Sequence, residues 1–92
     1  MFSGIVEDKA RVLGIVHDQD NVHFTLTCSS VDELSIDQSV AHNGVCLTVV
    51  CIKDNAYTVT AMRETLDCTN LRYLKVGNEV NVERSMLMNG RL

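Results

Sequence analysis

Proline is absent from all 92 residues of the sequence, and aromatic side chains make up only 4% of it. Basic residues are also sparse, since eight Lys and Arg stand against twelve Asp and Glu and form no cluster. Phosphate binding relies on a concentrated positive surface, so nucleic acid is a poor candidate partner. The apolar runs are only a few residues long, whereas a membrane-spanning helix needs about 18 residues. The sequence therefore argues against both nucleic-acid binding and membrane insertion.

Apolar residues, in contrast, are plentiful at 46% of the sequence, which is enough to offset chain entropy and form a folded domain. A length of 92 residues allows one domain with a small core. A site that needs burial on all sides would have to borrow a wall from a partner chain.

No charged leader followed by an apolar stretch opens the sequence, so we expect a cytoplasmic, reducing location and free thiols. The cysteines, at positions 28, 46, 51 and 68, include no Cys-x-x-Cys pair, and their spacings match no common zinc pattern. Cys46 and Cys51 fall in one predicted strand, where an odd separation places them on opposite faces. We expect small buried thiols and neither a metal nor a cofactor.

The dominant hydrophobic period is two, which predicts β-strands. The predicted strands cover residues 4–17, 22–28, 39–42, 45–52, 57–62 and the segment from 80 onwards. Gly14 marks a bulge or bend in the first strand, and Asn43-Gly44 is a strong hairpin signal. The nearly continuous apolar run at 45–52 predicts a strand that is buried on both faces or that lines a barrel.

Helical signals are short. Ser30 and Glu33 fit a capping box, which predicts a helical turn that ends near Ile36. The leucines after Arg63 predict a helix of about ten residues. About six short strands with one or two small helices are typical of a compact antiparallel barrel or sandwich.

Polar side chains adjoin turns in four segments, namely residues 3–4, 39–48, 60–65 and 81–84. In the second segment, Cys46 and His42 suggest a thiol nucleophile with an imidazole base. The alternative is that Cys46 is a small residue on a pleated face. The third segment is a strand-to-helix junction, whose unpaired N–H groups suit an anionic or carbonyl-rich ligand. The alternative there is plain capping by Thr65 or Glu64.

Two further pairs of polar residues are weaker candidates for a functional site. Glu83 and Arg84 occupy adjacent strand positions, so they point to opposite faces and need separate partners. His17 and His23 fall at strand positions that face solvent, and we expect no role for either.

Taken in order, four motifs resemble riboflavin synthase. Residues 1–7, MFSGIVE, are similar to that family's opening Met-Phe-Thr-Gly-Ile, with Ser3 in place of Thr. Residues 39–49, SVAHNGVCLTV, resemble its Asn-Gly-x-Cys-Leu-Thr segment, and residues 64–71, ETLDCTNL, its Glu-Thr-Leu helix start. Residues 77–84, GNEVNVER, resemble its Gly-x-x-Val-Asn-x-Glu-Arg strand. The motifs span nearly the whole chain, which is thereby identified as similar to the amino-terminal lumazine-binding domain.

The resemblance implies an all-β fold, a six-stranded antiparallel Greek-key barrel with one or two short helices, over residues 1–92. It implies half of a two-barrel transferase, in which each barrel binds one molecule of 6,7-dimethyl-8-ribityllumazine. Two such molecules are dismutated to riboflavin and 5-amino-6-ribitylamino-pyrimidinedione without a metal or organic cofactor. In that family the reaction centre forms between an amino-terminal barrel of one subunit and a carboxy-terminal barrel of another, within a homotrimer, and the resemblance implies the same here.

The resemblance also implies a site that binds the lumazine or riboflavin. Its residues would be Gly4, Ile5 and Val6 around the ring, Cys46, Leu47 and Thr48 as the floor, and Thr60, Ala61, Met62, Arg63, Glu64 and Thr65 around the pyrimidine and ribityl chain. Ser39 and Cys46 are the catalytic candidates for proton transfer, with His42 as a further candidate. The main catalytic contribution would be to stack the two rings in the correct orientation.

The sequence stops at Leu92, before the family's Gly-Gly-His segment and second barrel. We therefore expect ligand binding with little or no turnover by this chain alone, and possible pairing into a homodimer that shields the half-pocket. One alternative is a non-catalytic carrier of lumazine or flavin. Another is a partner-binding β-domain without a small ligand.

Overall fold

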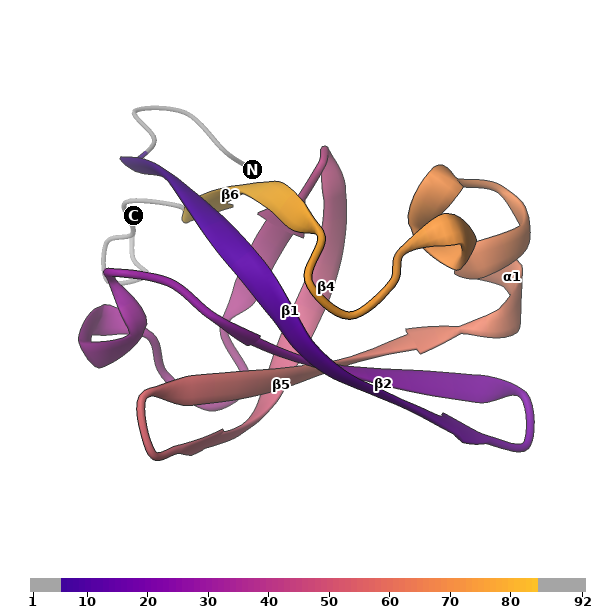
Figure 1. Ribbon diagram of the computed structural model, residues 1–92, viewed down its shortest axis with the longest axis horizontal. Helices are drawn as coiled ribbons and strands as arrows, with labels where there is room; N and C mark the ends of the chain where they lie inside the picture. Colours follow the sequence, from indigo (N-terminus) through magenta and orange to yellow (C-terminus); the bar gives the residue numbers. More distant parts are fainter. Residues whose placement is uncertain (1–5, 85–92) are drawn as a thin grey trace.

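The computed structural model describes residues 6–84, and their six strands form a closed antiparallel barrel (Figure 1). The strands are β1 (Val6–Asp18), β2 (Asn21–Thr27), β3 (Ser39–His42), β4 (Val45–Lys53), β5 (Ala56–Met62) and β6 (Glu79–Arg84). Their order around the barrel is β1-β2-β5-β4-β3-β6. Because β5 rather than β3 lies beside β2, the chain crosses one end of the barrel between β2 and β3, as in a Greek key. The predicted all-β, six-stranded Greek-key barrel is confirmed.

β1 closes the barrel because it pairs with two neighbours. Its first half pairs with β6, from Val6 opposite Arg84 to Arg11 opposite Glu79. Its second half pairs with β2, and the register shifts between Val12 and Gly14. The predicted bulge at Gly14 is therefore present, and it lets one long strand turn from one neighbour to the other.

The core lies inside the barrel and follows the period-two pattern. On β2 the inward side chains are Val22, Phe24 and Leu26, and on β5 they are Tyr57, Val59 and Ala61; all six are buried. Two alternatives were predicted for β4, burial on both faces or a strand that lines a barrel, and the structure shows the second. Its inward Leu47 and Val49 are buried, while Thr48 is exposed, so β4 lines the barrel with one face only.

The cysteines also differ from the prediction of small buried thiols. All four carry free thiols, and Cys46, Cys51 and Cys68 are exposed. The prediction that Cys46 and Cys51 face opposite ways is wrong, because the β4–β5 register shifts between Val49 and Cys51. This bulge adds one residue and returns Cys51 to the outer face.

The hairpin turns require a backbone that proline cannot adopt. Asn43 and Gly44 have φ angles of 51° and 87°, and Asp54 and Asn55 have φ angles of 54° and 64°. Such positive pairs are typical of type I′ turns, whereas the proline ring fixes φ near −65°. The Asn43-Gly44 hairpin is confirmed, and these turns give a physical reason why proline is missing from them.

A short 3-10 helix, η1 (Val31–Glu33), lies at one end of the barrel. The predicted capping box is wrong, because the hydroxyl of Ser30 donates to the carboxylate of Asp8 at 3.1 Å and makes no cap bond. Glu33 instead pairs with Arg84 at 2.8 Å. The hydroxyl of Ser30, which was expected to cap η1, thus donates to Asp8 on β1 instead.

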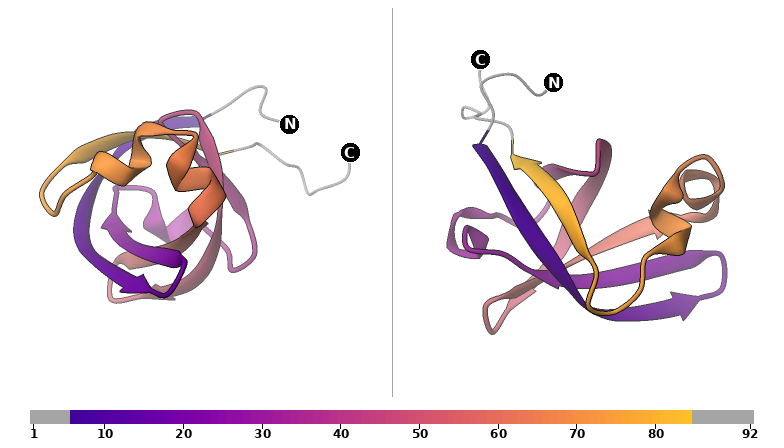
Figure 2. Two further views of the ribbon diagram at one scale, coloured as in Figure 1. Left: turned by 90° about the vertical axis from the view of Figure 1, so that its right-hand side faces the viewer. Right: turned by 45° about the horizontal axis from the view of Figure 1, so that its top comes forward.

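The predicted ten-residue helix is divided into α1 (Arg63–Asp67) and the 3-10 helix η2 (Asn70–Tyr73). Thr69 has an extended backbone between them, and its hydroxyl accepts the N–H of Leu71 at 3.2 Å. Figure 2 shows both segments over the end of the barrel opposite η1. Leu71 is fully buried there, so the apolar pattern was read correctly although the helix is interrupted.

Candidate functional site

Three of the predicted site residues form a row of hydroxyl groups across three strands. Ser39 on β3 lies directly opposite Thr48 on β4, and Thr48 lies directly opposite Thr60 on β5. All three side chains face outward, with Ser39 and Thr48 exposed and Thr60 half-buried. Neighbouring strands lie about 4.8 Å apart, so the barrel brings together hydroxyls from distant parts of the chain.

Cys46 and Met62 belong to the same outer face. Cys46 lies two residues before Thr48 on β4, and Met62 lies two residues after Thr60 on β5. Because β4 and β5 are antiparallel and Thr48 is opposite Thr60, Cys46 and Met62 lie next to each other on the same side of the row. Cys46 is exposed, and Met62 is 62% exposed. We call Ser39, Cys46, Thr48, Thr60 and Met62 the hydroxyl face.

The start of α1 adjoins this face directly, since β5 ends at Met62 and α1 begins at Arg63. No side chain caps α1, so the prediction of plain capping by Thr65 or Glu64 is wrong. The guanidinium of Arg63 lies 3.3 Å from the carboxylate of Asp20. The first-turn amides of α1 are therefore not occupied by a capping side chain.

The other predicted binding residues lie elsewhere. Leu47 and Ala61 are buried in the core, so only their backbone can reach the outer face. Val6 is the first residue of β1 and pairs with Arg84. Gly4 and Ile5 lie outside the described residues.

His42 lies inside the barrel, and the predicted pairing with Cys46 is wrong. Its side chain is 1% exposed. It pairs across the β3–β4 ladder with Val45, whereas Cys46 pairs with Ala41. Because successive residues on a strand point to opposite faces, the inward imidazole cannot reach the outward thiol.

The environment of His42 keeps its imidazole neutral. Nδ1 lies 3.0 Å from the carbonyl oxygen of Val40, and Nε2 lies 2.8 Å from the hydroxyl of Tyr57. A carbonyl only accepts, so Nδ1–H donates to Val40 and the phenol donates to Nε2. Burial lowers the pKa of His42 from 6.5 to about 4, and burial also raises the pKa of Tyr57. Both groups are structural parts of the core.

No motif singles out His23, and no role was expected for it, yet its Nδ1 lies 2.8 Å from Oγ1 of Thr60. Its Nε2 lies 3.5 Å from the carboxylate of Asp18. Alternation along the strand correctly indicated that His23 faces outward. The missing information was the pairing of β2 with β5, which places His23 directly opposite Thr60.

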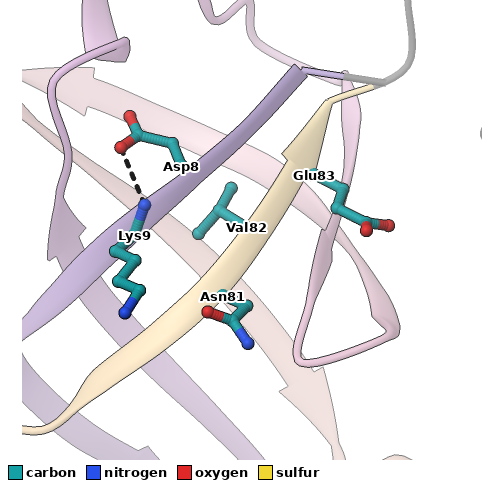
Figure 3. Close-up of a pocket in the computed structure, with 5 residues that line it drawn as sticks. All are labelled: Asp8, Lys9, Asn81, Val82 and Glu83. Atoms are coloured by element: carbon teal, nitrogen blue, oxygen red, sulfur yellow. Dashed lines mark hydrogen bonds between the residues drawn. The ribbon is translucent and has the colours of Figure 1, made fainter. Parts of the chain in front are cut away.

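A separate cavity of about 320 Å³ lies between β1 and β6, and it is lined by Asp8, Lys9, Asn81, Val82 and Glu83 (Figure 3). Asp8 accepts hydrogen bonds from the hydroxyls of Ser29 and Ser30. The Ser29 bond is the main reason that the pKa of Asp8 is lowered. In Figure 3 the carboxylate of Glu83 points away from Lys9. The carboxylate of Asp8 thus holds the Ser29–Ser30 turn against the barrel.

Within residues 6–84, no group of three or more His, Cys, Asp or Glu side chains is placed to hold a metal ion. In the same part of the chain, no helix is long and apolar enough to cross a membrane.

Comparisons with known proteins place this geometry in context. The chain matches the lumazine binding domain family over residues 3–85. It is 40% identical to the riboflavin synthase of Bacillus amyloliquefaciens over 92 residues, which are 99% of this chain and 43% of that protein. It is 45% identical to the riboflavin synthase of Escherichia coli (strain K12) over 87 residues, which are 92% of this chain and 41% of that protein. The chain thus spans less than half the length of these curated relatives.

Two solved structures share the fold over the whole chain. One is LumP complexed with 6,7-dimethyl-8-(1'-D-ribityl) lumazine, with a TM-score of 0.85, 26% identity and 52% of that chain covered. The other is LumP complexed with riboflavin, with a TM-score of 0.83, 28% identity and 53% of that chain covered.

Proposed function

The chain belongs to the lumazine-binding domain family, and from this premise we propose that its hydroxyl face binds 6,7-dimethyl-8-ribityllumazine or riboflavin, as one barrel of a riboflavin synthase. The observation that supports this most directly is the row Ser39–Thr48–Thr60, in which three hydroxyls adjoin the start of α1. The relatives and the structures with bound lumazine and riboflavin agree with this choice of ligand.

The hydroxyl face suits the chemistry of such a ligand. A pyrimidinedione ring presents carbonyl and N–H groups, which the hydroxyls of Thr48 and Thr60 and the first-turn amides of α1 can satisfy. The exposed Met62 offers a polarizable apolar surface on which a flat ring can pack. The face is open, so a second barrel would have to cover the other side of the ring.

The reaction itself is a proposal for the whole enzyme, because the chain spans only 43% of the relative from Bacillus amyloliquefaciens. Ser39 and Cys46 are exposed and could reach a second lumazine, where they would assist proton transfer. The barrels would hold the two rings in the orientation that the dismutation needs. We propose a homotrimer for the full enzyme and pairing into a homodimer for this barrel alone, in the cytoplasm and without a metal or organic cofactor.

A non-catalytic carrier of lumazine or flavin is the second candidate, because the two LumP complexes hold these ligands in a protein of the same fold. The Ser39 and Cys46 side chains separate the candidates, because a carrier has no use for groups that transfer protons. A partner-binding domain without a small ligand is the third candidate.

Titration of riboflavin with the 92-residue chain tests the proposal through quenching of flavin fluorescence. We expect binding at micromolar concentrations and, for Thr48→Val, an affinity about tenfold lower, since one buried hydrogen bond is lost. Thr25→Val makes the same change on the outer face of β2, beside Thr58 rather than Thr60, and should leave the affinity unchanged. An absence of quenching by the unchanged chain would refute both the synthase and the carrier hypotheses.

A further inference from the structure

The row of outward side chains does not end at Thr60. His23 lies directly opposite Thr60 on β2, so the row continues from β3 through β4 and β5 to a fourth strand. The side chain of His23 is 31% exposed. A ligand that lies across the row can therefore reach the imidazole.

The imidazole is held at both nitrogens, which fixes the direction of each hydrogen bond. The carboxylate of Asp18, 3.5 Å from Nε2, can only accept, so Nε2 carries the proton and points toward it. Nδ1 then accepts from the hydroxyl of Thr60 at 2.8 Å. This arrangement leaves lone pairs of the Thr60 oxygen and of the Asp18 carboxylate free to accept further hydrogen bonds.

A second contact brings the same hairpin to the start of α1. Asp20, in the turn between β1 and β2, lies 3.3 Å from Arg63, the first residue of α1. Asp18 is thus linked to Thr60 on β5 through His23, and Asp20 contacts Arg63 on α1 directly. Both aspartates lie beside the junction of β5 and α1. Together, these contacts form an edge of polar groups beside the hydroxyl face, at the far end of the row from Ser39.

We propose that His23, held by Asp18, positions the hydroxyl of Thr60 to bind hydroxyl groups of the ligand's ribityl chain, and that it thereby makes the protein prefer ribityl-bearing ligands to the ring alone. The hydroxyls of a polyol chain can donate to the Thr60 oxygen and to the Asp18 carboxylate, which keep free lone pairs on either side of the His23 ring. With the ring at Thr48 and Met62, a chain that extends across β5 reaches β2 after about one strand spacing of 4.8 Å. The inference rests on the proposed function, because it assigns one end of the same site.

Two flavins with the same ring system test the role of His23. Riboflavin carries the ribityl chain, and lumiflavin carries a methyl group in its place. For His23→Leu we expect the affinity for riboflavin to fall about tenfold, because the Thr60 hydroxyl and the Asp18 carboxylate lose the partner that holds them, while the affinity for lumiflavin stays within about twofold. His23→Gln keeps a donor and an acceptor and should recover most of the affinity for riboflavin.

The matched control is His17→Leu, because His17 lies on the neighbouring strand and lines a different cavity with Phe24 and Leu71. It should change neither affinity. The inference is overturned if His23→Leu weakens both flavins equally, or if it weakens neither. If the unchanged chain binds neither flavin, the proposed function fails and this inference fails with it. If the unchanged chain binds riboflavin but His23→Leu does not selectively lower the affinity for it, only this inference fails.

Discussion

His42 and Tyr57 are joined by a hydrogen bond of 2.8 Å inside the barrel, while Cys46, four residues after His42, lies on the outer face. A sequence in which Cys46 and His42 straddle a tight turn suggests a nucleophile and its base. The barrel instead places His42 in the core and Cys46 on the hydroxyl face, which leaves the histidine with a structural role.

The first prediction concerns stability at acidic pH. The unfolded chain protonates His42 near pH 6.5, but the folded chain does so only near pH 4. Between these values the unfolded state binds more protons, so the free energy of unfolding falls as the pH falls and is unaffected by His42 above this range. The loss between pH 7 and pH 4 should be roughly 3 kcal/mol, measured by urea unfolding at each pH.

The control for this prediction is a histidine on the surface. His42→Gln should flatten the dependence between pH 4 and 6.5, although it lowers stability at pH 7, whereas the exposed His17→Gln should leave the slope unchanged. An equally steep slope in His42→Gln would show that another group is responsible.

Glycine substitutions test the backbone of the hairpins. Gly44 has a φ of 87°, so Gly44→Ala should destabilise the protein by about 1–2 kcal/mol, because a Cβ is strained in the left-handed region. Gly14 lacks this constraint, and an added Cβ there would meet only the Cβ of Thr25 at 4.0 Å. Gly14→Ala should therefore be nearly neutral. Thermal unfolding of the two variants compares them directly, and equal losses would contradict the type I′ turn.

The carboxylate of Asp8 provides the third prediction. It accepts bonds from the Ser29 hydroxyl at 2.8 Å and from the backbone N–H and hydroxyl of Ser30 at 3.2 and 3.1 Å. Asp8→Ala should lower the free energy of unfolding by about 1–2 kcal/mol, and Asp32→Ala, at an exposed position of η1, by much less. Because the pKa of Asp8 is lowered in the folded state, its contribution is present at neutral pH and is lost as the pH falls through that lowered value.

Ser39 and Cys46 provide the fourth prediction, in a two-barrel protein made by joining this chain to the carboxy-terminal half of a relative. Ser39→Ala and Cys46→Ala should each slow the formation of riboflavin from lumazine by about 100-fold if the side chains transfer protons. Cys51→Ala is the control, since that thiol is exposed on β4 outside the hydroxyl face. Near-normal rates in both variants would remove these side chains from the mechanism and favour the carrier hypothesis.

Local sequence patterns predicted the strands, the Asn43-Gly44 turn and the bulge at Gly14, because each depends on neighbouring residues alone. The motifs at residues 1–7, 39–49, 64–71 and 77–84 predicted the family, and the comparisons confirm it. The resemblance to that family also implied Ser39, Thr48 and Thr60 as site residues, and these form the row Ser39–Thr48–Thr60.

The differences arise where distant residues compete with local preferences. Asp8 takes the hydroxyl of Ser30 away from the expected cap, and Thr69 interrupts a helix that its leucines predict. A bulge after Val49 reverses the face of Cys51. The contact of His23 with Thr60 depends on the pairing of β2 with β5, which no local pattern specifies.

Alkylation of the thiols with and without riboflavin tests most directly whether the hydroxyl face binds the ligand. Cys46 lies on that face, whereas the exposed Cys51 and Cys68 lie outside it. Mass spectrometry after treatment with N-ethylmaleimide reports the modification rate of each cysteine in the unchanged chain. At saturating riboflavin we expect Cys46 to be protected while Cys51 and Cys68 react at their original rates. If Cys46 reacts with N-ethylmaleimide at the same rate in the presence of bound riboflavin as in its absence, the proposed site is contradicted.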